Sequence, residues 1–442
     1  MASGINLVLG VAGWFLTYSK DGMQMKNRDG YLIVTLGWIV MSLSGCSIYL
    51  LSGAIPDYTN AFFETMSGYT TTGASILTDI EGLPKGILFW RSLTQWIGGM
   101  GIIVLAVAIL PLLGIGGMQL FVAEAPGISP DKLKPRIQDT AKRLWLIYVL
   151  LTASEAILLM LGGMSFYDAV NHSLTTMATG GFSTKNASIA HFESPYIHYI
   201  IILFMFLAGT NFTLTYFTFK GKFKKVWNNE EFRAYLLIAI LITIVVSLIV
   251  FSVTNDSVEK SLRDSLFQVV SIMTTTGFVT ADYTGWIPIL TMAFFGLMFI
   301  GGSAGSTAGG VKIVRHLVLF KTSALEIKQQ LHPAAVLPVR LNGKGISKDI
   351  TFHVLAFIMI YLTMFSIGCV LLAWAGLDFD AALGAAATSI GNIGPGLGSV
   401  GPVSNFGGIP AEAKWILTFL MLIGRLELFT VLILLTPAFW KQ

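Results

Sequence analysis

The chain has 442 residues, of which 54% are hydrophobic and 12% are charged, and its mean hydropathy is +0.73. Soluble domains carry about 25% charged residues, so this composition excludes a soluble globular enzyme. The formal net charge of +4 is small and the lysines are scattered, which argues against a nucleic-acid-binding surface. Cys46 and Cys369 lie inside apolar runs, so we expect no disulfide framework.

Eight apolar runs are long enough to cross a membrane, and one integral membrane domain is therefore expected. The run near 286–320 holds five glycines within ten residues, which predicts a broken helix at membrane depth. A further apolar segment at 3–18 lacks the basic start and the cleavage site of a signal peptide. The other runs lie near 31–51, 88–113, 143–162, 196–219, 234–253, 351–375 and 412–436.

The basic residues predict the orientation of the chain. Most of the 28 lysines and arginines fall in one set of alternate connections, and only a few fall in the other. Cytoplasmic loops carry the excess of positive charge in membrane proteins. We therefore expect a multi-pass protein of the cell inner membrane with its C-terminus in the cytoplasm.

The four outward connections share one pattern, in which an aspartate near the start is followed by a glycine near the end. The aspartates are Asp57, Asp168, Asp264 and Asp380. The glycines, Gly73, Gly180, Gly277 and Gly394, recur about 100 residues apart, which is the signature of an internal repeat. Each connection can form a short re-entrant helix that begins at the aspartate and stops in the membrane.

These features predict an all-α integral membrane fold. Four pseudo-symmetric repeats of span, re-entrant helix, filter loop and span would surround a central pore. The expected organisation is an N-terminal apolar segment and linker at 1–27, and pore repeats at 28–118, 119–221, 222–330 and 331–442, the third with a broken second span.

The residues around the four glycines are candidate ligands for a cation. Backbone carbonyls can replace the water of a dehydrated ion where glycine allows unusual dihedrals. Since no ring of acidic side chains occurs there, a weakly hydrated monovalent ion is favoured over calcium, and potassium fits best. One Thr-Thr-Gly would be an ordinary helix C-cap, but four matching copies favour a filter. The predicted filter residues are Thr71, Thr72, Gly73, Ala178, Thr179, Gly180, Thr275, Thr276, Gly277, Asn392, Ile393 and Gly394.

Several segments resemble those of the TrkH-type subunits of the Trk/Ktr/HKT potassium transporter superfamily. Besides the four loops, they are Arg28-Asp29-Gly30, Arg91 to Gly101 (RSLTQWIGGMG), Gly301 to Lys312 (GGSAGSTAGGVK), Asn392 to Gly396 (NIGPG) and Gly424 to Glu427 (GRLE). The resemblance covers nearly the whole chain. Members of this type usually carry two more membrane segments before the Arg-Asp-Gly motif, where only residues 3–18 precede it here.

The resemblance implies potassium uptake through a gated, channel-like pore, a homodimer in membrane lipid, and regulation by a cytoplasmic nucleotide-binding subunit of the TrkA type. Potassium would be the transported ligand, with no bound cofactor and no nucleic acid partner. It also implies that a glycine in all four loops favours potassium over sodium. Sodium- or proton-coupled potassium symport of the Ktr kind remains an alternative.

Two elements are candidates for a gate. Polar backbone in the glycine-rich loop of the third repeat must line water or protein, and in the resembling family this loop blocks the pore; close helix packing is the alternative for its small residues. Arg425 lies near the middle of the last span, where an unpaired charge is costly. We expect it to contact carbonyls of this loop and repel cations, or else to pair with Glu155 or Glu427. The other predicted gate residues are Gly301, Gly302, Ser303, Gly305, Ser306, Thr307, Gly309 and Gly310.

Glu64, in the first re-entrant helix, is predicted to anchor the helix behind the filter rather than to charge the outer mouth, because its neighbours Phe62 and Phe63 are apolar. An enzymatic function is not expected, because no catalytic set assembles at membrane depth. The six histidines fall near the two membrane surfaces. They are His172, His191, His198, His316, His332 and His353.

Overall fold

The architecture is that of a computed structural model, which describes residues 4, 10–11, 27–104, 133–254, 256–333, 335 and 337–441. Most of the expected N-terminal segment at 1–27 lies outside the described residues. The expected boundary between the first two repeats, at 118 and 119, lies outside them as well.

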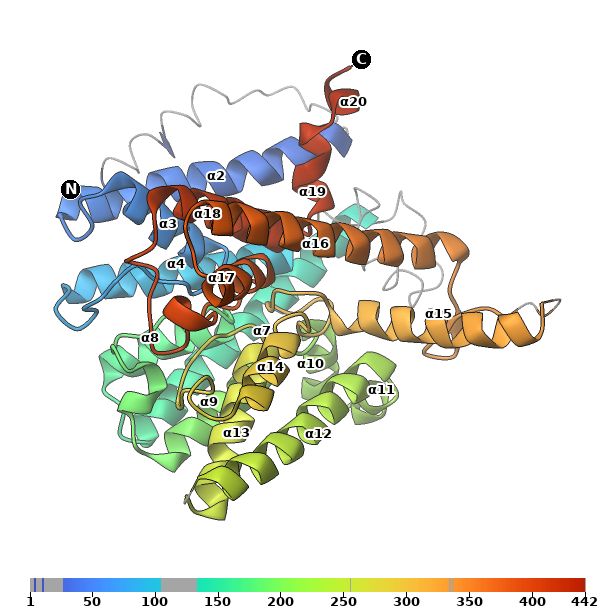
Figure 1. Cartoon of the computed structure of the whole chain (residues 1–442), viewed down its shortest axis with the longest axis horizontal. Helices are drawn as coiled ribbons and strands as arrows, with labels where there is room; N and C mark the ends of the chain where they lie inside the picture. Colours follow the sequence, from blue (N-terminus) through green and yellow to red (C-terminus); the bar gives the residue numbers. More distant parts are fainter. Residues whose placement is uncertain are drawn as a thin grey trace.

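Four long helices form the first span of each repeat (Figure 1). Their apolar stretches of 22 to 27 residues are long enough to cross a membrane. Only 22% of the apolar window of the third and fourth helices is buried within the protein, so their outer faces are available to lipid. The four helices are α2 (Asn27–Ser52), α7 (Leu133–Leu161), α12 (Glu230–Val253) and α16 (Lys348–Trp374).

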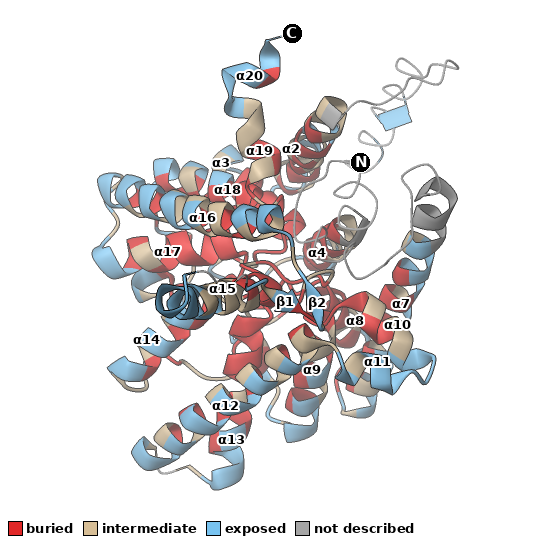
Figure 2. Cartoon of the chain, turned by 90° about the vertical axis from the view of Figure 1, so that its right-hand side faces the viewer, coloured by how far each residue is buried: buried red, intermediate tan, exposed pale blue. Residues whose placement is uncertain are grey.

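A shorter helix follows each of these spans and is largely buried near the centre of the molecule (Figure 2). These re-entrant helices are α3 (Tyr58–Tyr69), α8 (Phe166–Met177), α13 (Val258–Met273) and α17 (Phe379–Gly391). The Asp57 side chain caps α3 by accepting a hydrogen bond from the backbone N–H of Asn60 at 2.8 Å, as its position in the sequence predicts. Asp57 therefore sets where the first re-entrant helix begins.

The other three re-entrant helices begin earlier than the sequence predicted. Their N-cap residues are Ser165, Ser257 and Asp378. The aspartates expected at these starts, Asp168, Asp264 and Asp380, lie within the helices instead. Serine and aspartate cap helices about equally well, so the residue pattern alone did not rank the two kinds of cap.

The second spans are less regular than the first. In the first repeat α4 (Lys85–Val104) is continuous over its described residues. In the second, α9 (Pro195–Ala208) meets α10 (Phe212–Phe219) at 110°. In the third, residues 298–312 separate α14 (Pro288–Leu297) from α15 (Ile313–Leu331). In the fourth, α18 (Ala411–Arg425) meets the segment of α19 (Phe429–Leu432) and η5 (Ile433–Leu435), also at 110°.

The sequence predicted the break within 286–320 but treated 196–219 and 412–436 as continuous spans, and the bent helices correct that prediction. At the first bend the backbone N–H of Ser303 donates to the carbonyl of Gly209 at 2.8 Å, and the N–H of Phe212 donates to the carbonyl of Gly305 at 3.1 Å. At the second bend Glu427 and Leu428 have positive φ angles of 58° and 51°. The first bend is thus supplied with hydrogen bonds by a segment about 100 residues away in the chain, which hydropathy does not reveal.

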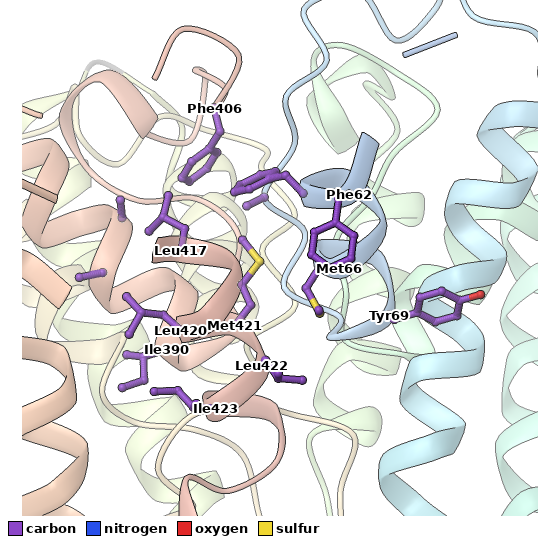
Figure 3. Packing of buried hydrophobic residues seen from close by; sticks show 14 of the residues in the cluster. Phe62, Met66, Tyr69, Ile390, Phe406, Leu417, Leu420, Met421, Leu422 and Ile423 are labelled. Atoms are coloured by element: carbon purple, nitrogen blue, oxygen red, sulfur yellow. The ribbon is translucent and has the colours of Figure 1, made fainter. Parts of the chain in front are cut away.

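The re-entrant helices pack in a cyclic order. Phe62 and Met66 of α3 and Leu417 and Met421 of α18 belong to one buried cluster, which joins the first repeat to the fourth (Figure 3). In the same way α8 packs on α4, and α13 packs on α9. Each of these three helices therefore contacts the second span of the preceding repeat, with the fourth repeat preceding the first. This order arranges the repeats around one axis.

The remaining described elements are small. They are η3 (Ser188–His191), α11 (Phe223–Trp227), η4 (Gly398–Val400), α20 (Pro437–Trp440) and the antiparallel pair β1 (Arg340–Leu341) and β2 (Lys344–Gly345). Asn342 and Gly343, between the two strands, have positive φ angles of 50° and 78°, as a type I′ hairpin turn requires. This hairpin is the only β-structure among the described residues of an otherwise all-α fold.

Candidate functional site

Each re-entrant helix ends in a loop with the same backbone conformation. A non-glycine residue at the helix end adopts the left-handed conformation, with φ between 53° and 56°. Two residues later a glycine also has a positive φ, between 76° and 104°. The first residues are Thr71, Thr179, Thr275 and Asn392, and the glycines are Gly73, Gly181, Gly277 and Gly394.

The residue between each such pair completes the repeated pattern. It donates its backbone N–H to the carbonyl five residues earlier, at 2.9 to 3.0 Å in all four loops. The donors are Thr72, Gly180, Thr276 and Ile393. Four loops of different sequence therefore share one geometry, as the internal repeat predicts.

The four loops contact one another in a closed ring. A Cβ atom added to any of the four glycines would lie within 2.9 Å of a carbonyl oxygen of the next loop, a distance that real Cβ atoms do not tolerate. The contacts, with the glycine first, are Gly73 with Gly180, Gly181 with Thr276, Gly277 with Ile393 and Gly394 with Thr72. Glycine is required at these positions because the neighbouring backbone approaches so closely.

The second loop has a different register from the one the sequence suggested. The alignment of the four repeats in the sequence matched Gly180 to Gly73. In the structure Gly181, not Gly180, is equivalent to Gly73. Thr179, Gly180 and Gly181 hold the positions expected for Ala178, Thr179 and Gly180, and Ala178 is the C-cap of α8. Two adjacent glycines fit the pattern equally well, and only contacts with the other loops distinguish them.

Gln95 of α4 explains why Gly180 is also a glycine. Its Nε2 donates to the carbonyl of Gly180 at 2.6 Å, and its Oε1 accepts from the backbone N–H of Phe182 at 3.1 Å. A Cβ atom on Gly180 would lie 2.5 Å from this Oε1. The amide of Gln95 thus fixes the second loop from behind, a role that the sequence analysis did not assign.

Glu64 lies behind the first loop and is fully buried. Its carboxylate accepts from the hydroxyl of Ser75 at 3.0 Å and from the backbone N–H of Ile76 at 2.9 Å. Nε of Arg91 lies 2.6 Å from the same carboxylate, and Nη1 of Arg91 donates to the carbonyl of Ser183 at 3.0 Å. The prediction that Glu64 is an anchor is confirmed, and the pair joins the first loop to the second.

The glycine-rich segment 298–312 lies against the ends of the re-entrant helices. The Thr307 hydroxyl donates to the carbonyl of Met177, the last residue of α8, at 3.0 Å. The backbone N–H of Gly309 donates to Oγ1 of Thr275 at 2.6 Å. A Cβ on Gly309 would overlap the carbonyl of Gly391, the last residue of α17. The segment therefore contacts three of the four repeats directly beneath the loops.

Arg425, at the end of α18, holds this segment. Its Nη1 donates to the carbonyl of Thr307 at 2.7 Å and its Nη2 donates to the carbonyl of Gly98 in α4 at 3.2 Å. Glu427 pairs instead with Arg315 of α15. In the described part of the chain neither Glu427 nor Glu155 bonds to Arg425, so the expected contact with loop carbonyls is found and the alternative pairing is not.

The space beside Arg425 is small. A cavity of about 20 Å³ lies among residues that include Gly309, Lys312, Tyr361 and Arg425. That volume suffices for about one water molecule. Gly309 of the segment and the guanidinium of Arg425 both border this small cavity.

Glu231 of α12 accepts hydrogen bonds from the segment and from the start of α15, a role that the sequence analysis also missed. Its Oε1 accepts from the backbone N–H of Ala304 at 2.7 Å and from that of Val314, in the first turn of α15, at 3.3 Å. The signal available in the sequence was an acid at the start of an apolar span. One carboxylate therefore fixes the segment relative to α12.

The ring of loops offers backbone and hydroxyl oxygens as ligands. Over the residues that the structure describes, no group of three or more His, Cys, Asp or Glu side chains could hold a metal ion. Oxygen ligands of this neutral kind suit a monovalent cation better than a divalent one.

Comparison with known proteins agrees with this geometry. Residues 1–442 match the TrkH family, described as cation transport protein. The chain belongs to the TrkH family. It is 42% identical over 443 residues to the Trk system potassium uptake protein TrkH of Escherichia coli (strain K12), and this match covers 99% of the chain and 91% of the relative.

Other TrkH-family relatives match over similar lengths. The Trk system potassium uptake protein TrkG of Escherichia coli (strain K12) is 39% identical over 439 residues, covering 98% of this chain and 90% of the relative. The crystal structure of the potassium transporter TrkH from Vibrio parahaemolyticus superposes with a TM-score of 0.89 at 40% identity. It covers 98% of this chain and 90% of that chain. The TrkH fold thus extends over all four repeats.

The ion pair behind the loops of this TrkH-family chain yields a prediction about stability. Glu64→Gln leaves the buried charge of Arg91 without its partner and should lower the free energy of unfolding by about 3 to 5 kcal/mol. Glu81→Gln is the matched control, since Glu81 and Lys185 form a more exposed pair at 3.5 Å, whose loss should cost less than about 1 kcal/mol. Denaturant unfolding of the purified proteins measures both, and equal effects would contradict the anchoring role.

Proposed function

We propose that this chain takes up potassium across the cytoplasmic membrane, with the ring of four loops as a selectivity filter. The observation that carries the proposal is the closed set of contacts between four glycines and four carbonyl oxygens. Neutral oxygens on a common axis can replace the water lost by a weakly hydrated cation. The names of the relatives, which are Trk system potassium uptake proteins, support potassium as that cation.

The re-entrant helices supply favourable electrostatics for the same ion. Each ends at the ring, so its C-terminal carbonyls carry partial negative charge toward the space beneath the loops. The Met177 and Gly391 carbonyls are two such groups. A cation that leaves the filter would meet these dipole ends before it reached the cytoplasm.

Segment 298–312 and Arg425 would form the gate of this pathway. The hydroxyl of Thr307 and the N–H of Gly309 bond to oxygens at the ends of the re-entrant helix and loop, and the guanidinium of Arg425 lies beside them. The gate thereby occupies the space below the filter with positive charge and hydrogen-bond donors. Conduction would require the segment to move away from the ring.

The remaining assignments follow from the family. We propose a homodimer in the inner membrane, with the C-terminus in the cytoplasm and no enzymatic activity. A cytoplasmic nucleotide-binding subunit of the TrkA type would regulate the gate. The designation "Trk system" in the names of the relatives supports a multi-component assembly.

Ion flux into liposomes that contain the purified protein tests the function. Rubidium, a tracer for potassium, should enter down an imposed potassium gradient and should not be driven by a sodium or proton gradient alone. Accumulation of rubidium against its own gradient when sodium or protons flow inward would support the coupled symport that the sequence leaves open. Absence of rubidium flux with and without the regulatory subunit would overturn the proposal.

The register of the second loop predicts a selectivity phenotype. Gly181→Ala places a Cβ against the carbonyl of Thr276, which must shift, so the preference for potassium over sodium should fall at least about tenfold, the effect of a 1.4 kcal/mol change. Gly163→Ala is the control, because Gly163 has a similar φ of 93° but nothing within 4 Å of an added Cβ. Competition between sodium and rubidium uptake measures the ratio, which should stay unchanged in the control. Equal ratios in both variants would place Gly181 outside the filter.

Arg425 gives the prediction for the gate. Arg425→Ala removes the donors to Thr307 and Gly98 together with the buried positive charge. Hydrogen bonds to charged groups contribute about 1.5 to 3 kcal/mol, so rubidium flux without the regulatory subunit should rise about tenfold or more. Arg233→Ala, which removes an exposed arginine at the start of α12, is the control and should leave flux unchanged. Unaltered flux through a folded Arg425→Ala protein would contradict the gating role of Arg425.

A further inference from the structure

A large groove lies on the second repeat, beside the first bend. It has a volume of about 850 Å³ and is bounded by α7, α9, α10, α11 and α12. This size is typical of sites that hold small organic molecules. Most of its walls are apolar and aromatic, including Leu151, Phe206, Leu214, Phe219, Trp227 and Phe232.

Helix α11 forms one edge of this groove and joins α10 to the apolar span α12 (Figure 1). Phe223 and Trp227 are 64% and 61% exposed, although both line the groove. Lys224 and Lys225 lie between them in the sequence. A short segment with aromatic and basic residues at the end of a span is typical of the boundary between acyl chains and headgroups.

The charge around α11 is strongly positive. Lys220, Lys222, Lys224 and Lys225 fall within six residues, and no acidic residue occurs between Glu193 and Glu230. The Lys220 and Lys225 ammonium groups lie over the rings of Tyr216 and Phe217, at 4.7 and 5.0 Å from the centroids. None of the ion pairs among the described residues includes these four lysines.

We propose that this groove binds an anionic phospholipid of the surrounding membrane. The acyl chains would lie against the aromatic wall, and the phosphate would lie at Lys224 and Asn228, the two longer polar side chains of the lining. Each lysine near an anionic membrane surface is attracted to the negative headgroups. The apolar wall adds a contribution that a soluble anion could not obtain. Complementary charge and apolar surface thus select one class of ligand.

The groove also borders the first bend. Leu207 and Thr210 line it on either side of Gly209, whose carbonyl accepts from the backbone N–H of Ser303. A bound lipid would therefore stabilise the bent form of α9 and α10, which holds one end of segment 298–312. This consequence rests on the proposed function, whereas the binding itself does not.

Native mass spectrometry of the purified protein with added phosphatidylglycerol or phosphatidylcholine tests the site. The protein should retain phosphatidylglycerol in preference to phosphatidylcholine. Lys224→Gln should lower retention of phosphatidylglycerol about tenfold, because a charge-assisted hydrogen bond is lost. Lys328→Gln, at the exposed end of α15, is the control and should change nothing.

A second variant separates the groove from the charge. Thr218→Trp places a large side chain at an exposed position of the groove wall and should reduce retention of both lipids. Equal retention of the two lipids, or retention that neither variant alters, would overturn the proposal. Cross-linking of Thr218→Cys to residues 105–132 or to a second copy of the chain in a lipid-containing membrane would also overturn it, since another occupant would fill the groove. None of these measurements requires ion flux, so they fail independently of the proposed function.

Discussion

The structure depends on one constraint: backbone that is not helical in the middle of an apolar protein must find its hydrogen bonds and its space inside the protein. The four loops meet this constraint together. Each folds back on its own re-entrant helix through the N–H of Thr72 or its counterpart. The missing Cβ of each glycine lets the carbonyl of the next loop approach closely. Removing any one loop would take away a close backbone contact of each of its two neighbours.

Segment 298–312 satisfies the same constraint in a different way. Its backbone is bonded to the bend at Gly209, to the hydroxyl of Thr275 and to the carboxylate of Glu231. These partners belong to the second and third repeats, and Arg425 adds the fourth. A segment held by separate hydrogen bonds can be released without unfolding the helices that supply them. This property suits an element that alternates between two positions.

Several buried charged side chains of this apolar protein bond either to an opposite charge or to backbone carbonyls. Glu64 and Arg91 join two loops behind the ring, and Arg315 and Glu427 join α15 to the second bend. Arg425 bonds to backbone carbonyls instead of a carboxylate. A guanidinium whose charge is not neutralised by an acid raises the local potential, so the placement of Arg425 differs in kind from that of a folding ion pair.

The sequence by itself determined the first span of each repeat, the fourfold repeat, the break within 286–320 and the positions of three of the four glycines. Hydropathy and glycine content decide these because lipid forces continuous apolar helices and because close backbone contacts exclude a Cβ atom. The tertiary structure alone decided that Gly181 follows the repeat, that α9 and α10 meet at an angle, and that Arg425 bonds to Thr307 and Gly98. Each of these features depends on contacts between segments far apart in the chain, and local composition does not reveal such contacts.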